Sequence, residues 1–404
     1  MKYNFDEIIE RRNTNALNTD GFRGYIFNAG PEKVFPYKDE EFIRMWVADM
    51  EFATPPEICD AMKARIEKRI FGYSGVYDSK YYDVFVKWCK DMYDWEFPQE
   101  QLVFSAGIIP ALYQLVEDIV LPDGKFMTMT PAYGFFLHAA EYNDVELVKS
   151  DLKYDNGTFK IDFDDFEKKA SDPSVKMIMW CNPHNPTGRV WTEEELKKVA
   201  EIVEKYDLWI ISDEIHCDLL RQDQRHIPMA KIMPEYKKLV TCMSASKTFN
   251  IAGLLHSNII IRDPEMRAQF VKRDKLVGSI NPISLEAHRT AYEKGGDWLE
   301  ELKTYLDENF KFMKEYLNEN APAVECFVPE ATYLAWVDMG KALPDVEDMC
   351  DFFANEAGVL LEGGNGLFVG NAEGYVRLNL AMPRALIAEG LKRMAAAIAK
   401  HNKK

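Results

Sequence analysis

The chain has 404 residues, of which 49 are Lys or Arg and 66 are Asp or Glu, so its formal net charge is −17 at pH 7. It is longer than the ~250–300 residues at which a single core usually stops growing, and we therefore expect two domains. A strongly acidic chain repels phosphate backbones and anionic lipid surfaces, which argues against nucleic acid and membrane as partners. Its longest apolar runs, such as residues 208–211, are far too short to span a bilayer.

The seven cysteines are scattered along the chain, and no two of them have CxxC spacing. This distribution argues against a disulfide framework and against a zinc cluster, so we expect no metal. Residues 1–6 show no basic region followed by an apolar one, as a secretory signal would. These features predict a cytoplasmic protein.

From about residue 55 onward, helical periodicity alternates with short apolar runs. Thr54 can cap a helix with Pro55 in its first turn, and apolar side chains then repeat four apart until Gly72. An amphipathic stretch at 193–205 is typical of a helix that crosses between strands. The apolar runs of strand length are 125–129, 177–180, 208–211, 239–243 and 258–261. Strands that alternate with helices predict a mostly parallel sheet covered on both faces.

The pattern changes after about residue 281. A long helical stretch comes first, and two strand-like runs then alternate with two further helices. The expected elements are a helix at 297–317, a strand at 333–337, a helix at 346–357, a strand at 375–380 and a final helix from about 384. This part reads as a second, α+β domain.

Polar residues follow the apolar runs in four segments, and the carboxyl ends of parallel strands are where such sheets bind ligands. Each segment taken alone also has an ordinary structural interpretation. Lys247 could be a desolvated nucleophile or, more commonly, a solvated lysine. Asp213 could pair with a cationic ring or cap a helix, and the Asn-Pro loop could be two rigid turns. The segments are Ser-Ala-Gly-Ile-Ile-Pro at 105–110, Asn-Pro-His-Asn-Pro-Thr-Gly at 182–188, Ser-Asp-Glu-Ile-His at 212–216 and Ser-Ala-Ser-Lys-Thr-Phe-Asn at 244–250.

The order and joint presence of these segments, followed by Arg-Leu-Asn at 377–379, resemble the fold-type I pyridoxal-phosphate enzymes of the class I/II aminotransferase superfamily. Within that superfamily the chain is most similar to the MalY/PatB-type cystathionine β-lyases and cystalysin, which are carbon–sulfur lyases. The segments that carry this second resemblance are Trp-Val-Ala-Asp-Met-Glu-Phe at 46–52, Gly-Tyr-Ser-Gly at 72–75, and the stretches 183–191, 212–218 and 247–254.

The resemblance implies an α/β fold with a mostly parallel, seven-stranded sheet sandwiched by helices in a large domain. It places this pyridoxal-phosphate-binding domain at 46–284, and a smaller α+β domain at 1–45 and 285–404. It also implies a homodimer that binds an amino-acid substrate, in which Tyr73 reaches the cofactor of the second subunit.

The resemblance further implies a catalytic set of Lys247, Tyr133 and Asp213. Lys247 would hold the cofactor covalently and take the Cα proton of the substrate. Asp213 would pair with the pyridine nitrogen, and Tyr133 would stack on the ring. Asn185 would donate to the ring's 3′ oxygen, and His216 would lie beside the cofactor.

The resemblance also assigns residues that bind two anionic groups, the carboxylate of the substrate and the phosphate of the cofactor. Arg377 would hold the substrate carboxylate in a two-pronged hydrogen bond, with Ala48 and Asn185 beside it. The cofactor phosphate would rest on the helix-start amides and two serines. These phosphate-binding residues are Gly107, Ile108, Ile109, Ser244 and Ser246, with Tyr73 from the partner.

Three positions depart from familiar patterns. Leu255 stands where many aminotransferases have a phosphate-binding arginine, and His216 stands where they have a tyrosine; the β-lyases share both differences. The segment 11–18 lacks the Lys-Trp-Asp that β-lyases commonly have near the substrate entrance.

The resemblance implies α,β-elimination of cystathionine or another cysteine S-conjugate to a thiol, pyruvate and ammonia. A class I/II aminotransferase would share every one of these residues. A regulatory role through protein contacts, as in MalY-type proteins, is a third possibility.

Overall fold

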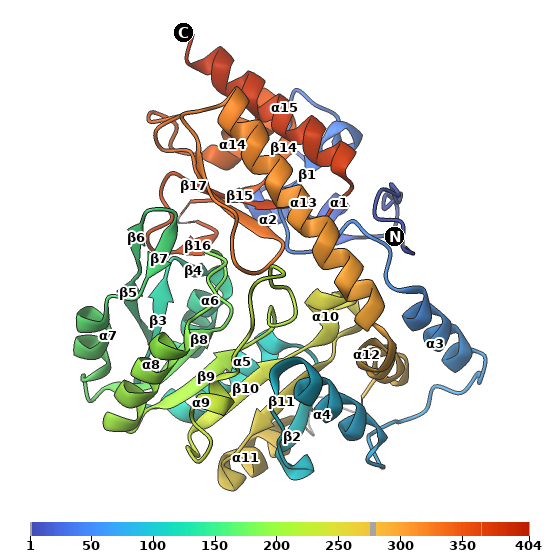
Figure 1. The fold of residues 1–404 in the computed structure, drawn as a ribbon, viewed down its shortest axis with the longest axis vertical. Coiled ribbons are helices and arrows are strands. Elements are labelled where there is room, and N and C mark those ends of the chain that lie inside the picture. Colours follow the sequence, from blue (N-terminus) through green and yellow to red (C-terminus); the bar gives the residue numbers. More distant parts are fainter. Residues whose placement is uncertain (1, 275–279, 365, 404) are drawn as a thin grey trace.

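The computed structural model describes residues 2–274, 280–364 and 366–403. Its largest feature is a seven-stranded sheet in which β11 runs antiparallel to both neighbours and all other adjacent strands are parallel (Figure 1). The predicted mostly parallel sheet is therefore confirmed. In spatial order its strands are β2 (Leu102–Ser105), β11 (Ser257–Ile261), β10 (Leu239–Met243), β9 (Trp209–Asp213), β8 (Val175–Cys181), β3 (Lys125–Thr130) and β5 (Glu146–Asp151).

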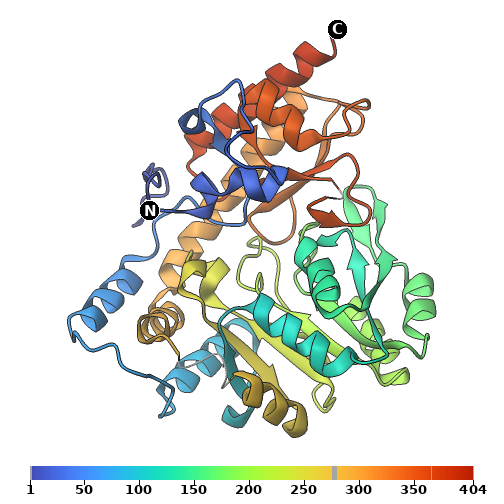
Figure 2. The same ribbon diagram turned by 180° about the vertical axis from the view of Figure 1, so that it is seen from behind.

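Helices cover both faces of this sheet because each inner strand is apolar on both sides. Phe126 and Met127, neighbours on β3, belong to two different core clusters on opposite faces. Figures 1 and 2 show the two helical layers from opposite sides. One layer contains α5 (Ile108–Val120), α6 (Gly134–Asn143) and α11 (Pro264–Asp274), and the other contains α4 (Lys80–Tyr93), α7 (Phe163–Ala170), α8 (Glu193–Lys205) and α12 (Pro282–Lys294).

The helix predicted at 193–205 is found over the same residues as α8. Thr192 caps its first turn: the Thr192 hydroxyl accepts from the Glu195 amide, and the Glu195 carboxylate accepts from the Thr192 amide. Leu196 and Val199 lie on its buried face, and burial of each such side chain stabilises the fold by ~1.5–3 kcal/mol.

The predicted cap at Thr54 is wrong. The helix α3 (Pro56–Ile66) has Pro55 at its N-cap position without a side-chain cap. The Thr54 hydroxyl instead donates to the Asn250 carbonyl at 3.1 Å. A tertiary hydrogen bond to a distant loop therefore takes the group that local sequence assigns to the helix start.

The remainder of the chain forms a four-stranded antiparallel sheet with helices against it. The strands are β12 (Glu325–Cys326), β13 (Leu334–Asp338), β17 (Tyr375–Asn379) and β15 (Glu362–Gly363), and the helices are α13 (Gly296–Asn320), α14 (Met349–Ala357) and α15 (Arg384–His401). All five elements predicted after residue 281 are present. α13 packs Trp298 into the same core cluster as the large sheet and Leu317 into that of the small sheet.

The N-terminal segment lies against this smaller part of the molecule. Its strand β1 (Ile43–Arg44) pairs in parallel with β14 (Val359–Leu360). Figure 2 shows its two short helices, α1 (Leu17–Asp20) and α2 (Phe22–Phe27), beside the C-terminal elements. Residues more than 300 positions apart therefore build one region.

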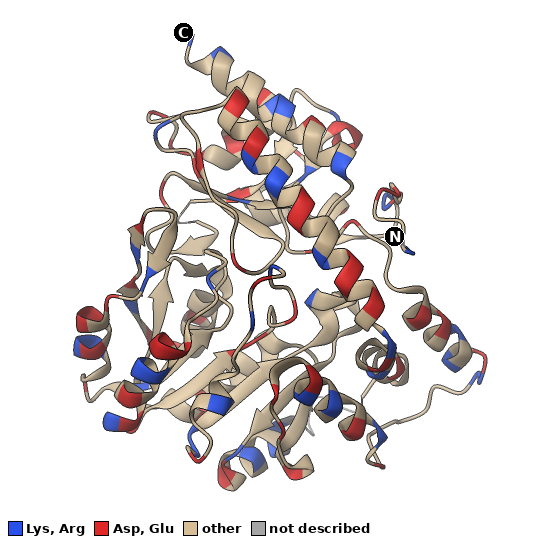
Figure 3. Ribbon diagram, in the orientation of Figure 1, with Lys and Arg blue, Asp and Glu red and all other residues tan. Residues whose placement is uncertain are grey.

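Charged residues of both signs are interspersed along the outer helices, as α13 illustrates in Figure 3. Among the described residues, no helix combines the length and apolar character needed to cross a bilayer.

Candidate active site

Three neighbouring strands of the large sheet end at the same edge. The register pairs Cys181 of β8 with Asp213 of β9, and Asp213 with Cys242 of β10. The Asn-Pro loop after β8, the carboxylate of Asp213 and the short helix α10 (Ala245–Thr248) after β10 therefore leave the sheet side by side. Side chains predicted to share a site are brought together here by strand register.

Lys247 lies on α10, and its Nζ donates to the carbonyl oxygen of Ala48 at 2.7 Å. Burial lowers the pKa of Lys247, Asp49 opposes this shift, and Arg377 adds to it. A lowered pKa makes more of the amine available in its neutral, nucleophilic form. The site thus contains an amine suited to attack on an aldehyde.

Asp213 is buried at the end of β9, where the Ile215 amide donates to its Oδ1 at 3.2 Å. Burial raises the pKa of Asp213 to about 7, and the nearby charge of Lys247 partly opposes that shift. A buried carboxylate of this kind is stabilised in its charged form by an adjacent cation. Its environment therefore fits the protonated nitrogen of a pyridine ring.

Arg377 is buried on β17, with 1% of its surface exposed. Its Nη1 donates to Asn185 Oδ1 at 3.1 Å, and its Nη2 forms a short ion pair with Glu362. Its Nε has no hydrogen-bond partner among the described residues. Arg377 and Asn185, both predicted site residues, are thus in contact, and the Nε–H of Arg377 remains available to an anion.

Tyr133 lies on β4 (Ala132–Tyr133), and its ring stacks on that of Phe135 at 5.1 Å between centroids. Burial raises the pKa of Tyr133 well above its usual value, so its hydroxyl stays protonated. The side chain of Tyr25, from α2, lies near that of Tyr133 and affects its pKa. No motif in the N-terminal segment had identified Tyr25.

A cavity of about 690 Å³ contains three of the predicted residues: Ala48, Tyr133 and Lys247. The walls that the sequence did not assign to the site include Tyr25, Phe135, Asn250 and Gly253, and the acidic residues Asp49 and Glu51. Asp49 and Glu51 lie within the motif at 46–52, and Asn250 and Gly253 lie within the one at 247–254, whereas Tyr25 and Phe135 lie in none.

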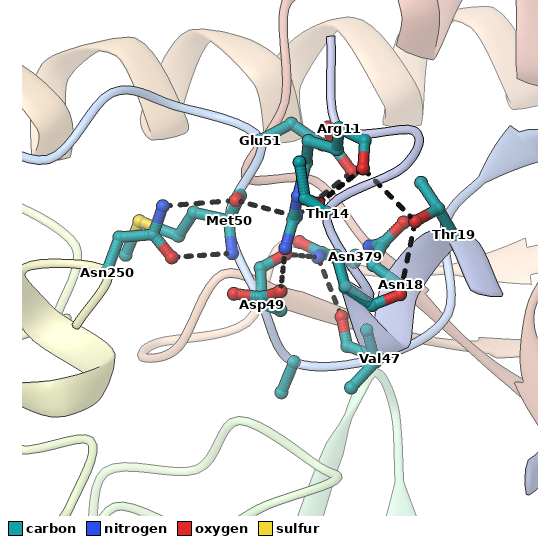
Figure 4. Close-up of polar contacts among 12 residues, drawn as sticks. Arg11, Thr14, Asn18, Thr19, Val47, Asp49, Met50, Glu51, Asn250 and Asn379 are labelled. Carbon is teal, nitrogen blue, oxygen red and sulfur yellow. Dashed lines mark hydrogen bonds and ion pairs between the residues drawn. The ribbon is translucent and has the colours of Figure 1, made fainter. Parts of the chain in front are cut away.

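The loop that carries Ala48 is held from both sides, as Figure 4 shows. From the small sheet, Asn379 Nδ2 donates to the carbonyls of Val47 at 2.9 Å and Asp49 at 2.7 Å. From the loop after α10, Asn250 Nδ2 donates to the carbonyl of Met50 at 3.1 Å. The Ala48 carbonyl is thereby fixed where it accepts the hydrogen bond from Lys247.

Arg11 reaches this loop from the N-terminal segment. Its Nη2 lies 2.5 Å from Asp49 Oδ2, and its Nη1 lies 3.5 Å from Glu51 Oε1 (Figure 4). Asn15, Ala16 and Leu17 line the same cavity. Part of the segment 11–18 therefore forms one wall of this cavity, and its place near the substrate entrance stays a prediction.

The sequence profile of the family described as aminotransferase class I and II matches residues 40–394. The chain belongs to that family. It is 36% identical to cystathionine β-lyase PatB of Bacillus subtilis over 98% of this chain and 100% of that protein, and 28% identical to protein MalY of Escherichia coli over 98% and 99%.

Solved structures show the same relationship. A pyridoxal-phosphate-bound C-S lyase of Staphylococcus hominis is 46% identical, with a TM-score of 0.93 and 98% of each chain covered. Cystalysin of Treponema denticola, whose structure contains pyridoxal 5′-phosphate, is 32% identical, with a TM-score of 0.90 and 99% and 100% covered. The expected fold-type I architecture is confirmed by these likenesses.

At the predicted phosphate site, the start of α5 offers free amides, whereas the Ser244 hydroxyl already has hydrogen-bond partners. Gly107 precedes α5, and the first amides of a helix, here those of Ile108 and Ile109, have no acceptor within it. The Ser244 hydroxyl, however, donates to the His256 carbonyl at 2.8 Å and accepts from the Ser246 amide at 3.1 Å. A phosphate contact at Ser244 would have to replace the first of these bonds, and this contact, like that of Ser246, stays a prediction.

His216 and Tyr73 differ in how the structure places them. His216 is buried, its ring lies edge-on to Tyr333 at 6.3 Å, and burial lowers its pKa to about 3, so it is neutral at pH 7. Tyr73 is 98% exposed and does not line the cavity with Lys247. Its predicted contact with a cofactor in a second subunit stays a prediction.

Proposed function

We propose that this chain is a pyridoxal-phosphate-dependent carbon–sulfur β-lyase that converts cystathionine and related cysteine S-conjugates to a thiol, pyruvate and ammonia. The observation that carries the proposal is the grouping of Lys247, Asp213, Asn185 and Arg377 around one strand edge. Full-length similarity to PatB and to C-S lyases favours elimination as the reaction.

Each of the site's own groups has a defined task in this reaction. The pyridoxal ring, when bound, supplies the electron sink for the charge that remains when the substrate Cα loses its proton. Lys247, with its lowered pKa, holds the cofactor and accepts the Cα proton at Nζ. Asp213 keeps the pyridine nitrogen protonated, and Arg377 orients the substrate through its carboxylate. Burial of the site excludes water and strengthens these charge interactions.

The test is to supply L-cystathionine to the holoenzyme with no keto acid present. We expect steady release of pyruvate, measured with lactate dehydrogenase, together with an equal amount of ammonia. Strict dependence on an added keto acid would refute elimination as the main reaction.

The family also supports a second candidate, a class I/II aminotransferase, since its profile covers residues 40–394. The same test separates the two, because transamination consumes a keto acid and releases no ammonia. Protein contacts of the MalY type are a separate possibility, for which a Lys247→Ala variant that retains its cellular effect would be the evidence.

We propose further that the enzyme is a cytoplasmic homodimer with a large domain at 46–284 and a small domain at 1–45 and 285–404. The pairing of β1 with β14 supports grouping the N-terminal segment with the C-terminal part. Exposed Phe71, Tyr73 and Tyr77, at 55%, 98% and 90%, support a subunit contact in that loop. Unpaired cysteines fit a reducing compartment. Light scattering tests the dimer.

A further inference from the structure

A second carboxylate lies at the place proposed for the substrate carboxylate. Glu362, on β15, stands directly opposite Arg377 of β17 in the antiparallel register and is 2% exposed. Its Oε2 accepts from Arg377 Nη2 in a short ion pair. Its Oε1 is buried and has no hydrogen-bond partner among the described residues.

This arrangement leaves the guanidinium with little net charge for a ligand. Glu362 neutralises Arg377, and Asn185 accepts from Nη1, so only Nε is without a partner in the described chain. A substrate carboxylate that binds here would lie close to an ionised glutamate. Two carboxylates that share one buried site cannot both ionise freely, and one of them takes up a proton.

The groups that face Glu362 come from five elements. Two are cationic, Arg377 on β17 and Lys247 on α10, and both oppose the rise in the pKa of Glu362 that burial causes. The others are groups that are ordinarily neutral at pH 7, and burial raises their pKa values further. They are Tyr25 on α2, Tyr133 on β4 and Cys350 on α14. Of the acidic groups that the structure describes, Glu362 alone forms an ion pair with the guanidinium, so it is the group that must change its protonation.

We propose that Glu362 and the substrate carboxylate compete for Arg377, and that carboxylate binding is coupled to uptake of one proton by Glu362. The proton comes from solvent and is bound at the carboxyl group, whose Oε1 has no other partner. Glu362 thus acts as a positioning residue that makes substrate affinity depend on pH. This inference rests on the proposed role of Arg377 as the carboxylate-binding residue.

The experiment is titration calorimetry of the holoenzyme with 3-(methylthio)propionate, which carries the carboxylate and thioether of a substrate but no amine. Measurements in phosphate and in Tris at pH 8 give the number of protons taken up, because these buffers differ in ionisation enthalpy. We expect close to one proton per ligand, and an affinity that falls about tenfold per pH unit wherever free Glu362 is ionised.

Glu362→Gln removes the competing charge and keeps the side-chain shape. We expect this variant to bind the probe at least about tenfold more tightly at pH 8 than the wild type, with no proton uptake and no pH dependence of affinity. Glu373→Gln is the matched control, since Glu373 is an exposed carboxylate close to the same strand. It should behave as the wild type.

The experiment distinguishes failure of the proposed role of Arg377 from failure of the proposed competition with Glu362. If Arg377→Gln binds the probe as tightly as the wild type, Arg377 is not the carboxylate site, and its role in the proposed function fails. If binding needs Arg377 but the wild type takes up no proton, the competition is refuted while that role stands. The wild-type proton count needs no variant, so poor folding of Glu362→Gln would not leave the inference untested.

Discussion

The floor and the roof of the candidate site are built in different ways. The floor consists of Asp213, Asn185 and Lys247, which lie at or just beyond the ends of three adjacent parallel strands whose ends are aligned by register. The roof comes from chain segments far apart, held by side chains such as Arg11 and Asn379 that bind the loop at 47–52. A floor built on backbone register gives precise placement to the reacting groups. The roof is held by side-chain contacts, so we expect substitutions there to change substrate affinity more than the rate of the chemical step.

Lys247→Ala tests the floor and has the largest expected effect. Loss of the amine removes both the covalent link to the cofactor and the group that accepts the Cα proton, so kcat should fall by at least about 10³-fold. Pyruvate release from L-cystathionine measures this. Lys237→Ala, at an exposed lysine, is the control and should be unchanged. Substantial turnover by Lys247→Ala would mean that another group performs these tasks.

Arg377→Lys tests a buried residue on β17, the strand that also carries the roof residue Asn379. Lys keeps the positive charge but cannot bind a carboxylate with two parallel donors, so KM should rise about 10–100-fold while kcat changes much less. Initial rates over a range of S-substituted cysteines give both constants. An unchanged KM would remove Arg377 from substrate binding.

Asp213→Asn tests the buried carboxylate of the floor, and the measured quantity is the Tm of the cofactor-free protein at different pH values. Because the pKa of Asp213 is raised to about 7, the folded state holds its proton between pH 4 and 7 and the unfolded state does not. The folded state therefore loses stability relative to the unfolded state as pH rises through that window. Asp213→Asn should raise Tm by about 2–5 °C at pH 8 and have little effect at pH 4.

The sign of the Asp213→Asn result decides its meaning. A Tm that falls at pH 8 would show that the ionised carboxylate is stabilised in the empty site. For the holoenzyme we expect the opposite outcome, because the variant loses the partner of the pyridine nitrogen and should release the cofactor more easily.

Arg11→Met should have the smallest effect of the four. The Arg11 side chain pairs with Asp49, and because both partners are partly exposed, at 20% and 26%, we expect the pair to contribute ~1 kcal/mol, near the upper end for ion pairs that solvent reaches. We expect KM to rise a few-fold and kcat to stay within about twofold, as measured by pyruvate release. A loss of kcat as large as that in Lys247→Ala would mean that the roof takes part in the chemistry.

The difference between floor and roof also explains what the sequence could predict. Lys247, Asp213 and Asn185 each lie in a segment that follows an apolar run of strand length, and the order of these segments gives the resemblance that assigns their roles. Glu362 meets Arg377 only because β15 and β17 pair in one register, and Tyr25 lies in a segment with no motif. Contacts between distant segments leave no local pattern.

Two hydroxyl side chains, those of Thr54 and Ser244, show the same limit of sequence-based prediction. Thr54 has the residue type and position of a helix cap, yet its hydroxyl donates to the Asn250 carbonyl. Ser244 was assigned to a phosphate, and here it caps α10 and donates to His256. Ser and Thr hydroxyls form hydrogen bonds with whichever polar group the fold brings near, so residue type alone does not predict the partner.

The central claim is that pyridoxal phosphate is carried on Lys247 beside the buried carboxylate of Asp213. Borohydride reduction of the holoenzyme, followed by peptide mass spectrometry, tests this most directly. We predict a stable pyridoxyl-phosphate adduct on Lys247 and on no other lysine. An adduct on a different lysine, or none after reconstitution with pyridoxal phosphate, would contradict the claim.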